Sequence, residues 1–252
     1  MRLRVCREKV AEFVDVTGDD PDRWIEHAPP GWAGAALFAV APLLLTNEAV
    51  RSSLVIHGEQ RFSWLRPIAV EADLEALGEV SRVRERGGVW FINFDLTVTD
   101  GDGDLLTGSS SFLASGAAAP GTGQPEAPEL DPHSVEEGDF AASRADLVRY
   151  AAATRDWNPI HWDHRSAVAA GLPGIVVHGL LQSGWLLRSV LASVGGSAPI
   201  ARARFRYRAP LLAGMAASIV AERGGEEVTA RLVAAGNELV AASLHLRDGA
   251  SV

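Results

Sequence analysis

The stretch Phe205-Arg-Tyr207-Arg-Ala-Pro210 repeats a pattern that the chain has already used at Phe62-Ser-Trp64-Leu-Arg-Pro67. In both stretches aromatic residues stand at positions i and i+2, and a proline follows at i+5. Successive side chains of a strand point to opposite faces, so the two rings share one face. Proline cannot donate to a strand ladder and therefore ends the strand. The chain thus contains two copies of one β element.

The residues after each copy continue the repeat. A long strand-like run leads to a Glu-Arg-Gly-Gly turn, and two further alternating segments follow, joined by Gly-rich or Asn-containing turns typical of hairpins. Short hairpin turns predict antiparallel order. The expected segments are Ala69–Val83, Glu85–Gly88, Val89–Thr99 and Asp104–Ala114 in the first copy, and Leu211–Glu222, Glu222–Gly225, Val228–Ala234 and Glu238–Leu246 in the second.

A strongly hydrophobic helix is expected before each set of strands. In the second half it begins near Gly179 and includes Leu180, Leu181 and Trp185, and in the first half Ala35–Leu45 takes the same place. Apolar residues on nearly every face indicate a helix surrounded by other structure. We therefore expect an α+β fold of the tandem (double) hotdog type, in which each half is a curved antiparallel sheet around a central helix. A generic α+β fold is the alternative.

The segment between the two halves is rich in Gly, Pro, Ala and acidic residues, and its hydrophobic residues show neither helical nor strand periodicity. Such composition is typical of a linker over the surface. We accordingly expect a first hotdog domain at residues 1–115, a linker at 116–137 and a second hotdog domain at 138–252.

Composition excludes several classes of protein. A net charge of −9 argues against general nucleic-acid binding, and the single cysteine, Cys6, excludes a disulfide framework and suits a reducing cytoplasm. The first ten residues mix charged side chains without an apolar run, so we expect no signal peptide. The hydrophobic run Gly31–Leu45 is shorter than the roughly 20 residues of a membrane span. We expect a cytoplasmic protein without membrane association.

The residues that carry chemistry lie at the start of the second half. Ser143-Arg-Ala-Asp146 is a capping box that opens a helix ending near Thr154. The chain then reads Asp156-Trp-Asn158-Pro159-Ile-His161, where Pro159 biases Asn158 away from helical geometry. A short helix over about Asp163–Ala170, closed by Gly171, is expected next. Asp156 and His161 therefore flank a fixed turn.

His178-Gly179-Leu180-Leu181 marks the start of the buried helix. Glycine lets a ligand carbonyl approach the backbone closely, and the free N–H groups at a helix start stabilise developing negative charge. A lone Asp-x-Asn-Pro turn or a lone histidine is usually structural. The combination of the two motifs favours a functional site.

Asp156-Trp-Asn158-Pro159-Ile-His161 together with His178-Gly179-Leu-Leu strongly resembles the MaoC-like R-specific enoyl-CoA hydratases and (3R)-hydroxyacyl dehydratases, over most of the second half. The resemblance implies a lyase that reversibly hydrates trans-2-enoyl thioesters or dehydrates (3R)-3-hydroxyacyl thioesters. It implies that Asp156 and His161 hold the catalytic water and that Gly179 supplies an oxyanion-hole N–H. Asn158, His178 and Ser183 are the expected positioning residues.

The first half resembles the degenerate hotdog domain that accompanies such a catalytic domain. Val16-Thr-Gly18-Asp19-Asp20-Pro21 is similar to the same turn, but Asp22, Arg23 and Trp24 follow its proline and the motif histidine is absent. This departure argues against a second active site. The expected role of the first half is to replace a partner subunit and shape the acyl pocket, so both a monomeric pseudo-dimer and a homodimer are open.

Alternating arginines in the second half suggest how the thioester carrier binds. Arg202, Arg204, Arg206 and Arg208 share one strand face, and a solvated outer face is the plain interpretation. As a functional prediction, Arg204, Arg206 and Arg208 bind coenzyme A phosphates or the acidic surface of an acyl carrier protein. No cofactor is expected, since coenzyme A or phosphopantetheine enters only as part of the substrate.

Three competing interpretations stay open from the sequence. His161-Trp-Asp163-His164 has spacing reminiscent of metal ligands, although such neighbours converge poorly on one ion, and we expect no metal. A hotdog thioesterase would suit the fold but not the Asp-x-Asn-Pro-x-His turn. A non-catalytic protein that only binds acyl thioesters is the alternative from a different class.

Overall fold

A computed structural model describes residues 1–42, 54–116, 136, 138–196 and 199–247. The strands are β1 (Arg2–Arg4), β2 (Leu54–Trp64), β3 (Asp73–Arg86), β4 (Val89–Asp100), β5 (Gly103–Ser115), β6 (Ile200–Tyr207), β7 (Ser218–Gly224), β8 (Glu227–Ala234) and β9 (Asn237–Leu246). The helices are α1 (Arg7–Thr17), η1 (Pro30–Trp32), α2 (Ala33–Val40), α4 (Arg144–Thr154), η4 (Pro159–His161), α5 (His164–Ala169) and α6 (Gly179–Leu191).

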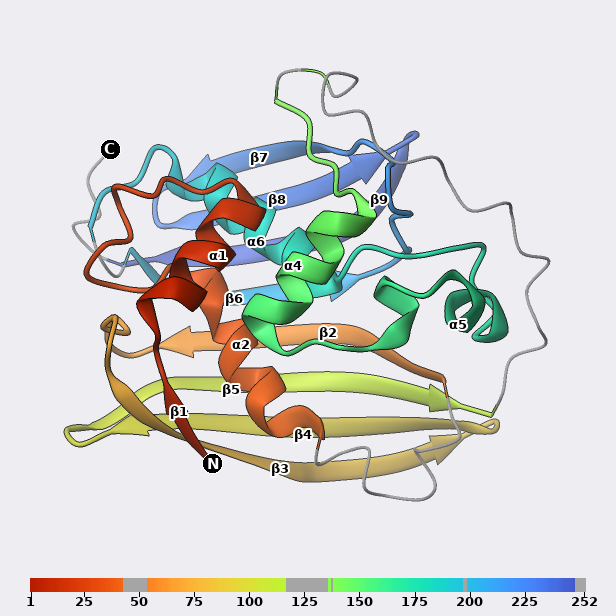
Figure 1. The fold of residues 1–252 in the computed structure, drawn as a ribbon, viewed down its shortest axis with the longest axis horizontal. Helices are drawn as coiled ribbons and strands as arrows, with labels where there is room; N and C mark the ends of the chain where they lie inside the picture. The colour runs from red at the N-terminus through yellow and green to blue at the C-terminus, as the bar shows by residue number, and fades with distance from the viewer. Residues whose placement is uncertain (43–53, 117–135, 137, 197–198, 248–252) are drawn as a thin grey trace.

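The described strands form one antiparallel sheet of nine strands in the order β1-β3-β4-β5-β2-β6-β9-β8-β7 (Figure 1). The two halves meet where β2 pairs with β6. In this register Phe62 lies opposite Ala203 and Gln60 opposite Phe205, on either side of the pair Arg61 and Arg204. The repeat matches Phe62 with Phe205, and therefore Gln60 with Ala203. Exchanging the two copies leaves this pairing unchanged, as a two-fold axis between them requires. The repeat read from the sequence is an internal pseudo-symmetry.

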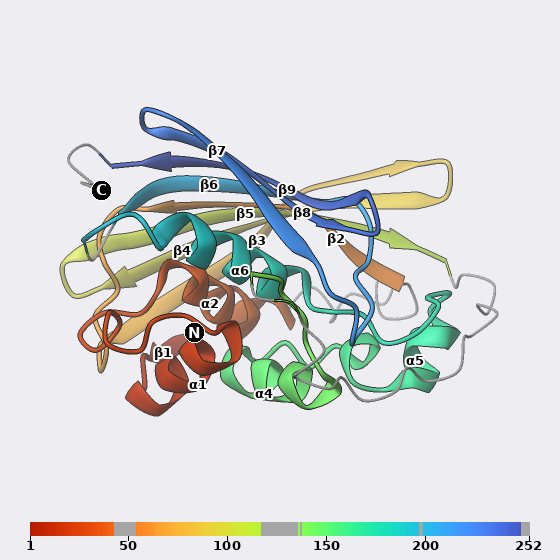
Figure 2. The ribbon, with the colours of Figure 1, turned by 90° about the horizontal axis from the view of Figure 1, so that it is seen from above.

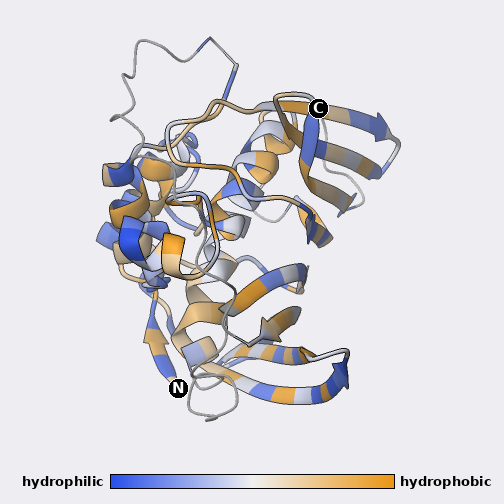
Figure 3. Ribbon diagram, turned by 90° about the vertical axis from the view of Figure 1, so that its right-hand side faces the viewer, coloured by the Kyte–Doolittle hydropathy of each residue, from blue (hydrophilic) through white to orange (hydrophobic). Residues whose placement is uncertain are grey.

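The helices cover one face of this sheet in two layers. Helix α2 packs on β3 and α6 packs on β8 and β9, while α1 and α4 pack against each other further from the sheet. Figure 2 shows the same order from above, with α2 and α6 between the strands and the outer helices. Along the strands near the bottom of Figure 3, hydrophobic and hydrophilic residues alternate, as expected when one face of a sheet is buried. No helix in the described part of the chain has the length and apolarity to cross a bilayer.

Several sequence predictions are confirmed at the level of local structure. Ser143 caps α4 in a full capping box, because its side chain accepts from the Asp146 N–H and the Asp146 carboxylate accepts from the Ser143 N–H. Helix α6 begins at Gly179, and the hairpin turns fall where the glycines predicted them. The helix expected over Ala35–Leu45 is α2, whose last predicted residues, 43–45, lie outside the described residues. Most of the linker expected at 116–137 lies outside them too, so the domain boundaries remain predictions.

The starts of two long strands were predicted wrongly. Strand β3 begins at Asp73 rather than Ala69, because Ala69 bridges to His27 and Glu71 adopts a positive φ of 67°. Strand β7 begins at Ser218 rather than Leu211. The residues before β7 pair elsewhere, since Leu212 bridges to Val176 and Ala217 bridges to Phe140. In both places these residues pair with segments that lead into a helix, at η1, α4 and α6.

Arg23 links the two halves by covering the end of α6. Its guanidinium donates to the carbonyl oxygens of Leu191 at 2.6 Å and of Val194 at 2.7 Å, in the turn that follows the end of α6. We expect Arg23→Ala to lower the free energy of unfolding by about 2 kcal/mol, the usual size for hydrogen bonds from a charged donor. Thermal or urea denaturation measures this, with the exposed Asp22→Ala as control. Equal stability of the two variants would contradict the linking role.

Candidate active site

A fixed turn places Asp156 and His161 after α4. The helix ends with Arg155, whose left-handed φ of 69° turns the chain and whose N–H donates to the Ala151 carbonyl. Pro159 opens the 3-10 turn η4, and Asn158 caps it by accepting from the Ile160 N–H at 3.4 Å. The predicted turn is therefore present, and Asn158 holds the loop.

The turn brings Asp156 and His161 together with His178. Potential ligand or hydrogen-bonding atoms of the three side chains all lie within 4.8 Å of one another, and each side chain is buried. The Val176 N–H donates to the Ile160 carbonyl at 3.2 Å, which ties the chain before His178 to the turn. Residues separated by 5 to 22 positions thus form one compact, buried polar cluster.

The hydrogen bonds of the two histidines indicate their tautomers. His161 Nδ1 lies 2.7 Å from the Val176 carbonyl oxygen, so Nδ1 carries the proton and Nε2 keeps its lone pair. His178 Nε2 lies 3.2 Å from the Asp156 backbone oxygen and donates to it in the same way. The two rings stack with centroids 3.9 Å apart, and Tyr150 contacts the other side of His178 at 4.8 Å. His178 therefore positions both the Asp156 backbone and the His161 ring.

Burial sets the charge states in this cluster. Burial raises the pKa of Asp156, while the neighbouring His161 and the Asn158 N–H oppose that rise. Burial also holds the pKa of His178 well below its usual value, and His161 lowers it further. A carboxyl with a raised pKa beside a neutral imidazole is the arrangement that general acid–base chemistry uses.

Gly179 begins α6 beside the cluster. As the first helical residue its N–H has no acceptor within the helix. A Cβ at this position would lie 3.1 Å from the Tyr207 ring, so only glycine leaves both the ring and the N–H in place. Ser183 donates to the Gly179 carbonyl at 3.2 Å and hydrogen-bonds the Tyr207 hydroxyl at 2.9 Å. Ser183 thus holds Tyr207 against the helix start.

Tyr207 is a site residue that the sequence interpretation missed. Its aromatic spacing with Phe205 was recognised as a strand signal, which correctly placed both rings on one face of β6, and in the structure that is the inner face. Nothing in the local pattern indicated the contact with Gly179, because that contact joins residues of different elements.

The predicted arginines lie on the outer face of β6 and just beyond its end. Arg204 and Arg206 both pair with Glu59 of β2, at 2.6 Å and 3.5 Å, and Arg208 pairs with Glu238 at 2.6 Å. These carboxylates offset part of the positive charge on which the carrier prediction rests. The sequence interpretation did not anticipate them, and carrier binding by these arginines remains a prediction.

A metal site is not favoured by the geometry. The Asp163 carboxylate accepts from the Ser166 N–H and caps α5. Asp163 is therefore used within its own helix and does not join His161 as a metal ligand. Asp156, His161 and His178 have suitable donor atoms, but the planes of the two imidazoles lie 26° apart in a stack. Lone pairs in neighbouring, nearly parallel planes converge poorly on one ion.

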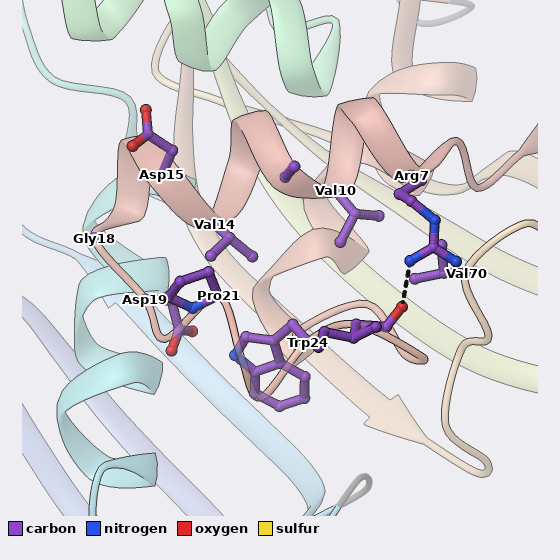
Figure 4. Close-up of a pocket in the computed structure, with 11 residues that line it drawn as sticks. Arg7, Val10, Val14, Asp15, Gly18, Asp19, Pro21, Trp24 and Val70 are labelled. Carbon is purple, nitrogen blue, oxygen red and sulfur yellow. Dashed lines mark hydrogen bonds between the residues drawn. The ribbon is translucent and has the colours of Figure 1, made fainter.

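A cavity of about 280 Å³ lies away from this cluster, beside α1. Figure 4 shows Val10, Val14 and Trp24 around it, with Arg7 donating to the Ile25 carbonyl at its rim. Gly18 and Asp19 of the first-half turn also line it. It therefore belongs to the half that lacks the motif histidine, and it offers no acid–base pair.

Comparison with known proteins places these observations in a wider context. Residues 126–242 match the family model described as MaoC like domain. The chain is 28% identical over 210 residues to the enoyl-CoA hydratase ChsH3 of Mycobacterium tuberculosis, covering 81% of this chain and 69% of that protein. It is 25% identical over 166 residues to the peroxisomal enoyl-CoA hydratase 2 of Arabidopsis thaliana, covering 59% and 53%. The chain spans about a third to a half of the length of several curated relatives.

Solved structures agree on the fold. HtdX of Mycobacterium tuberculosis superposes with a TM-score of 0.79 at 21% identity, covering 98% of this chain and 97% of that one. Rv0216 of the same organism, described as having a double hotdog fold, superposes with a TM-score of 0.67 at 13% identity, covering 98% and 94%. The α+β double hotdog predicted from the repeat is confirmed.

Proposed function

We propose that this chain, which belongs to the MaoC-like dehydratase family, catalyses the reversible hydration of trans-2-enoyl thioesters and the dehydration of (3R)-3-hydroxyacyl thioesters. The carrier is coenzyme A or an acyl carrier protein. The observation that carries the proposal is the convergence of buried Asp156 and His161 beside the N–H of Gly179. The relatives named as enoyl-CoA hydratases support the reaction class.

In the hydration direction, the oxygen of one water bonds to the β-carbon and a proton bonds to the α-carbon. Electron density moves to the thioester oxygen as the first bond forms. The Gly179 N–H would donate to that oxygen, and a single donor of this kind contributes about 3 kcal/mol in comparable sites. Asp156 and His161 would hold the water between them.

The geometry favours a division of the proton transfers. His161 Nε2 keeps a lone pair because Nδ1 donates to Val176, so His161 is suited to accept the proton that water loses. Burial raises the pKa of Asp156, so its carboxyl is suited to deliver a proton to the α-carbon. A proton then passes from His161 to Asp156, whose polar atoms lie within 4.8 Å of one another, and this restores both groups for the next turnover. Dehydration runs the same transfers in reverse.

The first half is proposed to be non-catalytic. Its α1 ends as α4 does. The hydroxyls of Thr17 and Thr154 each donate to the carbonyl four residues earlier, and a residue of positive φ, Gly18 or Arg155, follows. Asp19 then takes the place of Asp156, but five residues later, where His161 follows Asp156, the first half has Trp24. Pro30-Gly31 precedes α2 where His178-Gly179 opens α6, so the first half also lacks the second histidine. The surviving roles are structural and acyl-binding.

The direct test is loss of enoyl absorbance with crotonyl-CoA and with a longer trans-2-enoyl-CoA, combined with chiral analysis of the product. We expect a (3R)-3-hydroxyacyl product and no release of free thiol. Thiol release without hydration would identify a thioesterase instead. The protein would instead be a binding protein if it bound both thioesters tightly but neither hydrated nor hydrolysed them, and if carrier-protein thioesters gave the same result.

A further inference from the structure

A bulge in β2 directs one histidine of the first half toward the candidate site. The register between β2 and β5 shifts between His57, which lies opposite Phe112, and Glu59, which lies opposite Ser111. Gly58 is the extra residue, and a Cβ there would come within 2.6 Å of the Leu113 side chain. Without the bulge, residue 58 would share the inner face with Gln60, and the His57 side chain would point to the outer face. Bulges beside active sites commonly re-aim a side chain in this way.

The bulge puts the His57 ring between the two halves. It stacks on Phe112 with centroids 4.7 Å apart and contacts Tyr207 of the second half at 4.9 Å. Tyr207 in turn packs on Gly179 and hydrogen-bonds Ser183. The Tyr207 ring therefore contacts both His57 and the start of α6.

One nitrogen of His57 has no assigned partner. Nε2 is buried and makes no hydrogen bond to any residue that the structure describes. Burial lowers the pKa of His57 to about 4, although the Gln60 side chain and the Glu59 backbone oppose the shift. The ring is therefore neutral near pH 7 and offers Nε2 as one hydrogen-bonding atom. A buried polar atom left unpaired is costly, and such atoms in a native protein usually serve a ligand or a water.

We propose that His57 is a specificity-determining residue that selects acyl groups carrying a hydroxyl or carbonyl oxygen. This inference rests on the proposed function. The inner wall around His57 favours the acyl chain as the source of that oxygen, because neighbouring Phe112 and Ile92 are buried and apolar. The cations predicted to hold the carrier lie on the opposite face of the sheet. Gln60 and Ser110 also lie on this inner face, but they hydrogen-bond each other, whereas Nε2 of His57 has no partner among the described residues. A site discriminates strongly against substrates that leave such a polar atom unpaired.

The test compares 2-enoyl-CoA thioesters of equal chain length, each with one hydroxyl at a different carbon beyond the double bond, with the unsubstituted chain as reference. We expect wild type to prefer one hydroxylated chain by at least about tenfold in kcat/KM, the worth of one good hydrogen bond. His57→Phe keeps the stacked ring and should abolish that preference. His57→Gln keeps a hydrogen-bonding group near Nε2 and should retain part of it. His245→Phe is the matched control, because His245 is a half-buried histidine that pairs with Glu227 away from the site.

The outcomes separate this inference from the proposed function. Wild type that hydrates every chain equally, or a His57→Phe variant that loses activity equally on all of them, overturns the specificity role and leaves the hydratase proposal intact. If wild type hydrates none, the proposed function fails, and calorimetric binding of the same thioesters decides the inference. Tighter binding of one hydroxylated chain to wild type than to His57→Phe supports it, and equal binding overturns it.

Discussion

Replacing His161 by alanine is expected to lower kcat/KM for a trans-2-enoyl thioester by about 10²- to 10⁴-fold, the usual contribution of a positioned general base. The variant removes the Nε2 lone pair that the Val176 hydrogen bond leaves free for the substrate water. It leaves Asp156 and Gly179 in place, so substrate binding should fall much less than kcat. Stopped-flow or steady-state loss of enoyl absorbance measures both quantities.

His164→Ala is the matched control for this prediction. His164 opens α5, only three residues after His161, and it contacts the loop at Gly174 instead of the buried cluster. We expect it to retain most of the wild-type activity. If the two variants lost activity equally, the turn would matter only for folding. If His161→Ala stayed within about threefold of wild type, the assignment of the water-holding pair would be wrong.

The parts of the site that the sequence predicted are those set by local geometry. Pro159 restricts Asn158, Ser143 caps α4, and Gly179 starts a helix, and each of these effects acts within a few residues. The repeat revealed the fold because it copies short-range patterns in both halves. Asp156 and His161 were therefore placed correctly in relation to the turn.

The parts that could not be predicted depend on contacts between distant segments. Glu59, which pairs with Arg204, lies 145 residues earlier in the chain, so the arginine stripe looked uncompensated in the sequence. The bulge at Gly58 changes the face on which His57 lies, and period counting cannot detect one inserted residue. The contact of Tyr207 with Gly179 likewise requires the fold to bring the start of α6 to the end of β6.

Replacing Asp156 by asparagine is expected to abolish most activity and, at neutral to alkaline pH, to make the fold more stable. Burial raises the pKa of Asp156 in the folded state. Such a carboxyl favours folding while it is protonated, and that stability is lost as the pH rises through the folded pKa. The loss is about 1.4 kcal/mol for each unit by which the pKa is raised. Asparagine has nearly the same shape and never ionises, so it avoids the loss.

The stability advantage of Asp156→Asn should therefore grow from acid to alkaline pH, and urea denaturation at a series of pH values measures it. Asp163→Asn is the control with the opposite sign. Hydrogen bonds from Ser166 lower the pKa of Asp163, so its carboxylate favours folding above its unfolded pKa, and the variant should be less stable than wild type at neutral pH. A rise in stability with a fall in activity is expected where a protein keeps a costly buried ionisable group for catalysis. If Asp156→Asn were less stable than wild type across the whole range, Asp156 would be a structural residue and the proton-delivery role would be lost with it.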